Sequence, residues 1–317
     1  MNNKRDVWVR EVGTRDGLQS IATIFSTATK LEWIRREAAA GVSEIEVGSF
    51  VPAKLLPQMA DSAAVVAGAK LIPELRVSVL VPNLRGAESA ISAGADQLNY
   101  VLSVSEAHNR ANVRRSVQES IADFARIIAL RNAHPEYRTI RVAGGLATAF
   151  GCTIAGHVAL SDVLAAARAL IEIGADELVI ADTVGYGNPA QCREIFRAVL
   201  EIAKDIPVAA HFHDTRGLGL ANVDAALDVG VRRFDASLGG LGGCPYAPGA
   251  SGNIVMDDLV FMLEAMGLST GVDLEALLET RRFMEGHLGQ EPTRGAIARV
   301  GLPRGFVAAS GGHVTGG

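Results

Sequence analysis

The sequence predicts an α/β fold, specifically a (β/α)8 TIM barrel with extra C-terminal helices, in a chain of 317 residues. Three observations predict it. Short strand-like runs alternate with longer helical stretches eight times. Several of the strand-like runs are apolar with little alternation, as expected for parallel strands that are covered on both faces. Four of them follow a glycine-containing turn of the same form. A doubly wound parallel sheet is the alternative arrangement of these units.

The eight expected strands are short and mostly apolar. They are Val7–Gly13, Glu44–Phe50, Leu75–Val81, Gln97–Ser103, Thr139–Ala147, Glu177–Val184, Pro207–His213 and Arg233–Gly239. Helical patterns lie between them, the clearest being Thr29–Ala40, Val113–Ala133, Ser161–Ile173, Pro189–Lys204 and Leu220–Val229. Strand and helix therefore succeed one another along the whole chain, which favours a parallel sheet.

Four glycines occupy the same place in the repeated strand–helix pattern. Gly41, Gly94, Gly174 and Gly230 each follow a helical stretch and precede the second, fourth, sixth or eighth strand. Glycine at this point readily takes the left-handed conformation that ends a helix. The repeated turn supports the architecture and indicates nothing about function.

The segment after the last strand is expected to extend the barrel rather than to form a second domain. A glycine-rich loop, 239–252, is followed by apolar helical stretches from Asn253 to about Leu288. We expect a single catalytic domain over residues 1–290, because no linker divides it. Residues 291–317 are glycine-rich with little pattern, and we expect a mobile tail there.

Composition excludes several classes of protein. The net charge of −5 argues against a nucleic-acid binder, which usually carries a basic stripe. No apolar run reaches the roughly 18 residues of a membrane span, and the polar N-terminus has no apolar signal core. Three cysteines, an odd and small number, fit a reducing compartment. We therefore expect a cytoplasmic protein that binds neither nucleic acid nor membrane.

Polar residues gather where a TIM barrel places its active site, at the C-terminal ends of the strands. Five strands contribute: Arg15 and Asp16 after the first, Glu46 and Ser49 on the second, Asp182 and Thr183 on the sixth, His211 and His213 on the seventh, and Cys244 and Asn253 after the eighth. His108, just past the fourth strand, is expected to line the mouth of this site. The other isolated histidines show no ligand spacing.

The His211 and His213 pair is the strongest local signal. Residues i and i+2 of a strand point to the same face, so the two imidazoles would lie side by side. With Asp16 and Asn253 nearby they offer nitrogen and oxygen ligands that suit Mg²⁺ or Mn²⁺, and Zn²⁺ accepts the same ligand types. The spacing taken alone fits two structural histidines equally well. Its place at a strand end favours the metal site.

The charged residues at the first, second and sixth strand ends need partners. An adjacent Arg15 and Asp16 usually marks a surface turn, but at a barrel mouth one can bind a metal and the other a developing oxyanion. Glu46 and Asp182 lie in apolar strands, where an unpaired carboxylate is costly. Arg15 or a metal would partner them. The simpler alternative is a structural ion pair at the barrel end.

Cys244 lies in a loop whose glycines would allow it to move over the site. A thiol with an adjusted pKa acts as a general acid or base. A small apolar filler is the simpler interpretation, and we apply it to Cys152 and Cys192. The glycine run lacks the pattern of a phosphate-binding loop and does not open the first strand–helix unit, so it gives little support to a nucleotide site.

Five motifs carry a family resemblance. They are Glu11–Gln19, Gly48–Val51, Pro57–Asp61, His211–Thr215 and the cysteine loop Gly239–Asn253. Together they resemble the hydroxymethylglutaryl-CoA lyases, within the DRE-type TIM-barrel metallolyase superfamily. The likeness runs from about Val7 to Leu278. The cysteine loop is the specific element, because related condensing enzymes share only the Arg-Asp and His-x-His motifs.

The resemblance implies a metal site and an acyl-CoA substrate. Asp16, His211, His213 and Asn253 would ligate Mg²⁺ or Mn²⁺. The cation would bind the tertiary hydroxyl and a carboxylate of a 3-hydroxy-3-substituted glutaryl-CoA and lower the pKa of that hydroxyl. Cleavage of the C–C bond would give acetyl-CoA and a 3-keto acid, which is acetoacetate for the parent substrate. A homodimer is also implied.

The resemblance also implies roles for the remaining site residues. Arg15 would stabilise the enolate oxygen of acetyl-CoA, and Cys244 would supply or relay the proton that quenches the carbanion. Glu46 and Asp182 would orient Arg15 and assist proton transfer, with His211 also counted in the catalytic set. The expected substrate contacts are Arg15, Gln19, Ser49 and Thr183.

The chain departs from the family pattern in substrate-side loops. Residues 20–25 are Ser-Ile-Ala-Thr-Ile-Phe, without the usual Asn-Glu and Lys, and Leu56 replaces a Trp. Residues 151–156 are Gly-Cys-Thr-Ile-Ala-Gly, without the usual Glu. The metal and proton-transfer residues are all present. We hypothesise the same bond cleavage on a different acyl group, one that is bulkier or more apolar at C3.

Two other functions compete with the lyase. A condensing acyltransferase would join acetyl-CoA to a 2-keto acid, but it hydrolyses its thioester product and needs no cysteine loop. A non-catalytic acyl-CoA binder would have lost metal ligands or the cysteine, and this chain has lost neither. The lyase is therefore the preferred interpretation.

Overall fold

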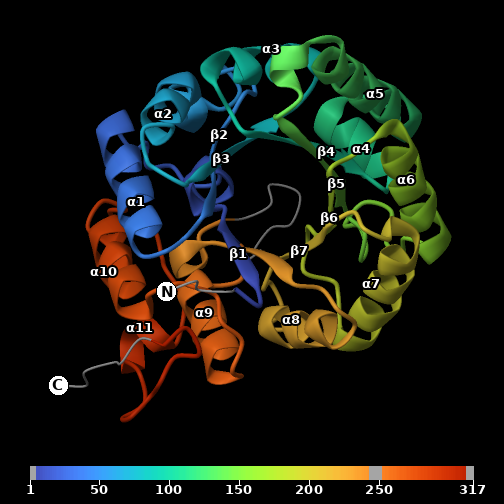
Figure 1. The fold of residues 1–317 in the computed structure, drawn as a ribbon. Coiled ribbons are helices and arrows are strands. Elements are labelled where there is room, and N and C mark those ends of the chain that lie inside the picture. Colours follow the sequence, from blue (N-terminus) through green and yellow to red (C-terminus); the bar gives the residue numbers. More distant parts are fainter. Residues whose placement is uncertain (1–4, 243–251, 312–317) are drawn as a thin grey trace.

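The computed structural model describes residues 5–242 and 252–311, and its centre is a closed barrel of eight parallel strands (Figure 1). The strands pair in chain order, and β1 closes the barrel by pairing with β8. They are β1 Trp8–Glu11, β2 Glu44–Ser49, β3 Arg76–Val81, β4 Gln97–Ser103, β5 Arg141–Ala147, β6 Glu177–Asp182, β7 Val208–Phe212 and β8 Arg233–Ala236. The predicted TIM barrel is confirmed, and closure excludes the doubly wound sheet.

The helices form a ring around the barrel. They are α1 Thr27–Ala39, α2 Ser62–Ala69, α3 Leu84–Ala93, α4 Glu106–Val113, α5 Val117–Ala133, α6 Leu160–Ile173, α7 Pro189–Ala203, α8 Gly219–Asp228, α9 Met256–Ala265, α10 Leu274–Glu285 and α11 Ile297–Val300. Side-chain oxygens of Ser26, Asn83 and Asn188 accept backbone N–H groups at the starts of α1, α3 and α7. Such caps satisfy donors that the first turn leaves free.

One predicted helix boundary is wrong. The sequence predicts a helix over Val113–Ala133, but Arg114 has a left-handed backbone (φ 57°) and separates α4 from α5. The side chain of Ser116 then caps α5 and Glu119 reaches back to the Ser116 amide. This Ser-x-x-Glu capping box is a start signal that the sequence carries.

The four repeated glycines have the predicted conformation. Gly41, Gly94, Gly174 and Gly230 have φ between 92° and 109°. Gly41 is needed for a second reason, since a Cβ there would lie 2.2 Å from the carbonyl oxygen of Gly271. The turn between α1 and β2 therefore lies directly against the segment that precedes α10.

The C-terminal helices extend the ring beside the first helix (Figure 1). Arg36 of α1 lies over the ring of Phe283 in α10, at 4.6 Å. Phe306 packs on Phe261 of α9, with ring centroids 5.1 Å apart, and the hydroxyl of Ser310 donates to Glu264 at 2.6 Å. The expected tail thus makes defined contacts as far as residue 310, while residues 312–317 lie outside the described part. Its mobility stays a prediction.

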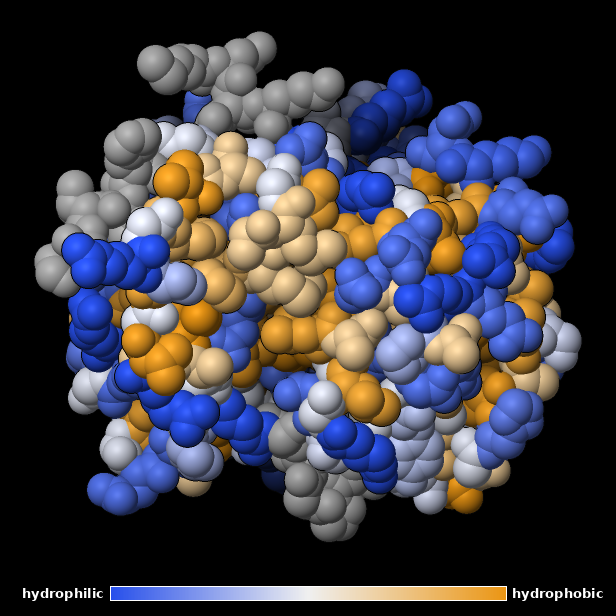
Figure 2. Space-filling model, turned by 90° about the horizontal axis from the view of Figure 1, so that it is seen from below, coloured by the Kyte–Doolittle hydropathy of each residue, from blue (hydrophilic) through white to orange (hydrophobic). Residues whose placement is uncertain are grey.

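The outer surface is chemically mixed. Figure 2 shows the side that is lowest in Figure 1, where hydrophobic residues gather near the centre of the face between hydrophilic ones. Among the described residues, none of the helices combines the length and the hydropathy that a membrane crossing requires.

Candidate active site and metal centre

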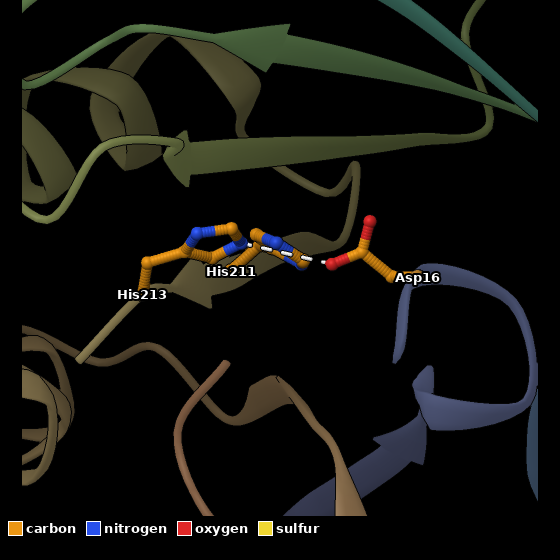
Figure 3. Close-up of side chains that lie close together, drawn as sticks. All are labelled: Asp16, His211 and His213. Atoms are coloured by element: carbon orange, nitrogen blue, oxygen red, sulfur yellow. Dashed lines mark ion pairs between the residues drawn. The ribbon is translucent and has the colours of Figure 1, made fainter. Parts of the chain in front are cut away.

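Two histidines at the end of β7 and an aspartate after β1 meet inside the mouth of the barrel (Figure 3). His211 is the penultimate residue of β7 and His213 follows its end, so the strand places both rings on one side, 5.2 Å apart. Asp16 comes from the helical turn Gly13–Gly17. One ligand atom from each of the three residues lies within 4.8 Å of the others. The juxtaposition expected from the i, i+2 spacing is present.

Both carboxylate oxygens of Asp16 are used. Its Oδ1 accepts hydrogen bonds from Arg15 Nη1 at 2.6 Å and from Gln19 Nε2 at 2.8 Å. Its Oδ2 accepts from Asn253 Nδ2 at 2.7 Å and lies 3.6 Å from His213 Nε2. Burial opposes ionisation, but the charge of Arg15 and the bond to His213 hold the pKa of Asp16 well below its usual range. Asp16 is therefore a buried carboxylate anion.

Asn253 joins this cluster through backbone pairing. It forms an antiparallel bridge with His213, which brings its side chain over the end of β7. Its Nδ2 donates to Asp16 and, at 3.1 Å, to the carbonyl of Leu241. Its Oδ1 and the Nδ1 of His213 are buried, and neither has a hydrogen-bond partner within the described ranges.

The donor set fits a divalent cation. Buried polar atoms normally find a partner, and the buried Oδ1 of Asn253, which has none among the described residues, is an oxygen ligand that a cation beside the anionic Asp16 could use. A carboxylate oxygen, an amide oxygen and two imidazole nitrogens are suitable ligands for Mg²⁺ or Mn²⁺. The four residues that the sequence proposes as ligands are therefore together, with lone pairs that a cation would satisfy.

A fifth residue, Asp235 of β8, fixes the orientation of His211. The two residues are direct neighbours in the β7–β8 pairing, and His211 Nδ1 lies 3.2 Å from Asp235 Oδ2. Burial alone would lower the pKa of His211, but Asp235 and Asp16 raise it overall. A carboxylate on one ring nitrogen leaves the other nitrogen to face the cluster. Asp235 is not among the residues that the sequence predicts for the site, although a charged residue in an apolar strand is a signal.

Arg15 is held by a second chain of side chains. Its Nε donates to Glu46 Oε2, and Glu46 Oε1 accepts from Asn99 Nδ2 at 2.8 Å. Asn99 Oδ1 in turn accepts from Gln97 Nε2 at 3.0 Å. Burial would lower the pKa of Arg15, but the charges of Glu46 and Asp16 raise it overall. The expected contact between Glu46 and Arg15 is present, and Asn99 was missed.

Asp182 does not orient Arg15, contrary to the expectation. Within the described part of the chain it has no hydrogen bond or ion pair with Arg15. It accepts the backbone N–H groups of Tyr186 at 2.8 Å and Gly187 at 2.9 Å, which fixes the turn after β6. Burial raises the pKa of Asp182 despite these bonds. Thr183 likewise bonds to the backbone, because its Oγ1 accepts a hydrogen bond from the Thr148 amide at 2.8 Å.

The remaining predicted residues have varied surroundings. Ser49 is buried, and its amide donates to Ser62 Oγ at 3.0 Å. His108, expected to line the mouth, is buried, with Nδ1 2.7 Å from Ser103 Oγ. Cys244 lies outside the described residues.

Cys152 and Cys192 are buried and free, as expected of small apolar fillers. Burial raises the pKa of Cys192, so it is held as the neutral thiol.

A wide cleft of about 720 Å³ opens beside the Asp182 turn. The loops after β5, β6 and β7 line it, with Tyr186 on one wall and Arg216 stacked over the Tyr186 ring at 4.5 Å. Gly151 and Gly156, the ends of the loop that departs from the family pattern, also line it. The volume is in the range of pockets for small organic ligands.

Fold and geometry together define a TIM-barrel enzyme with a buried candidate metal centre at the C-terminal ends of its strands. The family model described as HMGL-like matches residues 7–284, so the chain belongs to that family. The protein is accordingly a lyase, because curated relatives that match it over most of their own length are lyases.

The relatives and solved structures agree. The chain is 40% identical over 286 residues to the hydroxymethylglutaryl-CoA lyase of Bacillus subtilis, covering 90% of this chain and 94% of the relative. It is 40% identical over 305 residues to the (R)-citramalyl-CoA lyase of Chloroflexus aurantiacus, covering 93% and 95%. An HMG-CoA lyase from Acinetobacter baumannii, solved with coenzyme A and 3-methylmalate, is 41% identical with a TM-score of 0.88, covering 93% of this chain and 95% of that one.

Proposed function

We propose that this protein is a divalent-metal-dependent carbon–carbon lyase that cleaves a 3-hydroxy-3-methylglutaryl-CoA-type thioester to acetyl-CoA and a 3-keto acid. One observation carries the proposal: a buried Asp-His-His cluster lies directly beside a buried arginine, and the Asn253 oxygen at its edge has no partner among the described residues. The coenzyme A bound to the Acinetobacter baumannii relative supports an acyl-CoA substrate.

Asp16, His211, His213 and Asn253 would hold Mg²⁺ or Mn²⁺. When bound, such a cation lowers the pKa of an alcohol oxygen and stabilises negative charge near it. Asp16 supplies the anion, and its bonds to Arg15 and Gln19 fix the direction of its second oxygen. Asp235 keeps the His211 ring in one orientation. These contacts prepare the ligands before any substrate arrives.

The reaction needs a proton removed from the tertiary hydroxyl and a proton returned to carbon. As the alkoxide collapses to a ketone, the electron pair of the C–C bond passes to the departing acetyl-CoA enolate. Arg15, held by Glu46, lies next to Asp16 of the cluster. We assign to its positive charge the stabilisation of the enolate oxygen. We assign the returned proton to Cys244 and place His211 and Asp182 in the proton-transfer set, as the family resemblance implies.

The altered loops indicate where the acyl group differs. Gly151 and Gly156, the ends of the 151–156 loop, line the cleft beside the Asp182 turn, and Ile154 between them is 51% exposed. Residues 20–25 instead bond to the C-terminal segment, where the Ala22 amide donates to Glu291 at 2.9 Å. We propose that the 151–156 loop and Ser49 and Thr183 shape the pocket for the acyl substituent. The similarity to a citramalyl-CoA lyase makes a carboxylate directly on the carbinol carbon the second candidate.

The decisive assay measures acetyl-CoA release from hydroxymethylglutaryl-CoA, citramalyl-CoA and analogues with larger apolar groups at C3. Each is tested with Mg²⁺, with Mn²⁺ and with EDTA. We expect metal-dependent release from at least one thioester, and a loss of about 10²-fold or more in kcat for Arg15→Met and Cys244→Ser. Release that persists in EDTA, or no release from any of them, would contradict the proposal.

Two further properties are proposed with it. The assembly is a homodimer, which sedimentation equilibrium would test directly.

A condensing acyltransferase stays the alternative activity. Incubation with acetyl-CoA and a 2-keto acid would reveal it by the release of free coenzyme A.

A further inference from the structure

Thr148 has a backbone conformation that its residue type rarely adopts. Four non-glycine residues of the described chain have a positive φ, and three of them are exposed residues in a turn or at a helix end: Glu74, Arg114 and Lys204. Thr148 differs, because it is fully buried and directly follows the last residue of β5, with a φ of 59°. A β-branched residue is strained there, and such strain persists mostly at functional sites, where the surroundings hold the residue in place.

The hydroxyl of Thr148 ties the end of β5 to the end of β4. Its Oγ1 donates to the Ala147 carbonyl at 2.6 Å and accepts the Ser105 amide at 3.2 Å. The same Ala147 carbonyl accepts the Val104 amide at 2.9 Å, and Ser105 is the residue that caps α4. The hydroxyl therefore uses its donor and an acceptor site inside the protein, and these bonds hold the strained turn in place.

The amide of Thr148 reaches the end of β6. The pairing of β5 with β6 ends at Leu146 and Ile180. Beyond that pair, the Thr148 N–H donates to the Oγ1 of Thr183 at 2.8 Å. Thr183 directly follows the last residue of β6. The ends of three neighbouring strands, β4, β5 and β6, therefore meet at Thr148.

The turn at Thr148 also directs the loop that follows. The Thr148 carbonyl accepts the Gly151 amide at 3.2 Å. Between these two residues, Phe150 is buried and packs edge-on against Phe212, with ring centroids 5.8 Å apart. Phe212 is the last residue of β7, the strand at whose end the two cluster histidines lie. A change at Thr148 would therefore shift the start of the 151–156 loop relative to the candidate metal centre.

The bond from Thr148 leaves the Thr183 hydroxyl with a free hydrogen. A hydroxyl has one hydrogen to donate and two lone pairs that accept. The Thr148 N–H occupies one side of Thr183 Oγ1, so the hydrogen of that hydroxyl points elsewhere. Within residues 5–242 and 252–311 no acceptor takes this hydrogen. Thr183 is partly exposed at the C-terminal end of its strand, where a TIM barrel binds its substrate.

We propose that Thr148 is a positioning residue for substrate binding: its hydroxyl and its strained backbone fix the N–H that occupies one side of Thr183 Oγ1, so that the Thr183 hydroxyl donates to a carboxylate oxygen of the acyl group. The proposal rests on the proposed function, which supplies the substrate. Thr148 is fully buried and contacts no substrate, so its effect passes through Thr183.

Two variants separate the hydroxyl of Thr148 from the shape of its side chain. Thr148→Val keeps the branched shape but loses both bonds of the hydroxyl, so the strained turn relaxes and its N–H no longer orients Thr183. We expect KM to rise by about 10- to 100-fold, which is the effect of losing a hydrogen bond to a charged oxygen, with kcat within about threefold of the wild type. Thr148→Ser keeps the hydroxyl and should stay within about threefold in both constants.

Lys204→Val is the matched control for a general loss of stability. It places the same branched side chain at another residue with a positive φ, one that is exposed at the end of α7. The variant should lower the melting temperature and leave KM unchanged. Calorimetric Mn²⁺ affinity should be equal in all variants, because the four proposed ligands come from β1, β7 and the segment after β8. A KM for Lys204→Val as high as that for Thr148→Val would refute the proposal.

A double variant tests whether Thr148 acts through Thr183. Thr183→Val removes both the acceptor for the Thr148 N–H and the donor to the substrate, so its KM should also rise by about 10- to 100-fold. The double variant Thr148→Val/Thr183→Val should then match Thr183→Val within about threefold, because one interaction has been removed twice. Increases in KM that multiply would show that Thr148 acts independently of Thr183, and the proposal would be wrong.

Hydrogen exchange of the amide at position 148 is a readout that does not depend on turnover. We expect slow exchange in the wild type and in Thr148→Ser, and faster exchange in Thr148→Val and in Thr183→Val. If the wild type cleaved none of the thioesters, the proposed function would fail. The exchange rates would still decide whether the hydroxyl of Thr148 fixes the bond to Thr183.

Two results overturn the proposal directly. One is an unchanged KM with unchanged exchange in folded Thr148→Val, and the other is a Thr148→Ser variant as impaired as Thr148→Val. Thermal denaturation checks that each variant folds. If Thr148→Val does not fold, Thr148→Ala takes its place, because it also removes the hydroxyl but leaves no branched side chain in the turn. The same rise in KM is then required, and its absence would refute the role of Thr148.

Discussion

Asp235 connects the candidate metal centre to the floor of the barrel. Its Oδ2 lies 3.2 Å from His211 Nδ1, while its Oδ1 accepts from Arg10 Nε at 2.8 Å. Burial opposes its ionisation, but the charge of Arg10 and the bond to His211 lower the pKa of Asp235 to about 2. It is therefore an anion at neutral pH, able to hold the N–H of His211.

Replacing Asp235 by Asn should weaken metal binding without removing a ligand. The amide presents less negative charge to the His211 N–H, so the ring is held less firmly and is a weaker ligand. We expect Mn²⁺ affinity to fall by about 10- to 100-fold, measured by isothermal titration calorimetry. Asp123→Asn removes another buried carboxylate, which lies on α5 and pairs with Arg115 and Arg126, and should leave the affinity unchanged. Equal effects from both variants would refute the role of Asp235.

Individual site residues show which contacts the sequence predicts and which it does not. The pairing of His211 with His213 follows from the period of a strand, and the approach of Asp16 follows from the common end of parallel strands. Asp235 and Asn99 depend on the register between neighbouring strands, which no local pattern states. The expected contact of Asp182 with Arg15 is wrong because backbone N–H groups of its own turn reach the carboxylate first.

The turns that end helices set how closely the outer elements pack. Gly41 and Gly94 have almost the same backbone, with φ of 99° and 92°. A Cβ at Gly41 would strike the Gly271 carbonyl, whereas a Cβ at Gly94 would meet nothing within 4 Å. The two positions thus differ only in the space that surrounds them.

Alanine at the two glycines should therefore destabilise to different extents. Gly94→Ala should lower the free energy of unfolding by about 1–2 kcal/mol, the cost of a left-handed alanine. Gly41→Ala should cost about 1–3 kcal/mol more, because overpacking is added to the same strain. Urea denaturation measures both. Equal losses of unfolding free energy in the two variants would mean that the segment before α10 shifts to accommodate the added methyl group at no cost.

Elements were predicted better than their boundaries. All eight strands and the major helices follow from apolar runs and glycine turns, since these patterns are local. The sequence does not predict the break between α4 and α5 because the helical periodicity continues through Arg114, even though Ser116 and Glu119 form a capping box at the start of α5.

The whole barrel is tied together by a buried ion network. Arg10 of β1 binds Glu44 of β2 at 3.0 Å, Glu177 of β6 at 3.1 Å and Asp235 of β8. Arg233 adds a contact to Glu44 at 2.7 Å. One guanidinium thus joins four strands across the barrel interior, and removing it would leave carboxylates buried without their main partner.

Arg10→Met should be strongly destabilising for this reason. We expect a loss of about 3–5 kcal/mol in the free energy of unfolding, measured by urea denaturation. Adding Glu177→Gln should recover part of that loss, because one unpaired charge is removed. Arg35→Met breaks an exposed pair with Glu32 and should leave the free energy of unfolding nearly unchanged. If the buried and exposed arginines proved equivalent, the network would not hold the barrel.

The most direct test of the account is a calorimetric titration of the apoprotein with Mn²⁺, because the proposed chemistry depends on the cluster of Asp16, His211 and His213. We expect one site per chain in the wild type, an affinity lowered by about 100-fold or more in Asp16→Ala and His213→Ala, and no change in the surface variant His134→Ala. Unaltered binding in the two cluster variants, or no binding in the wild type, would contradict it.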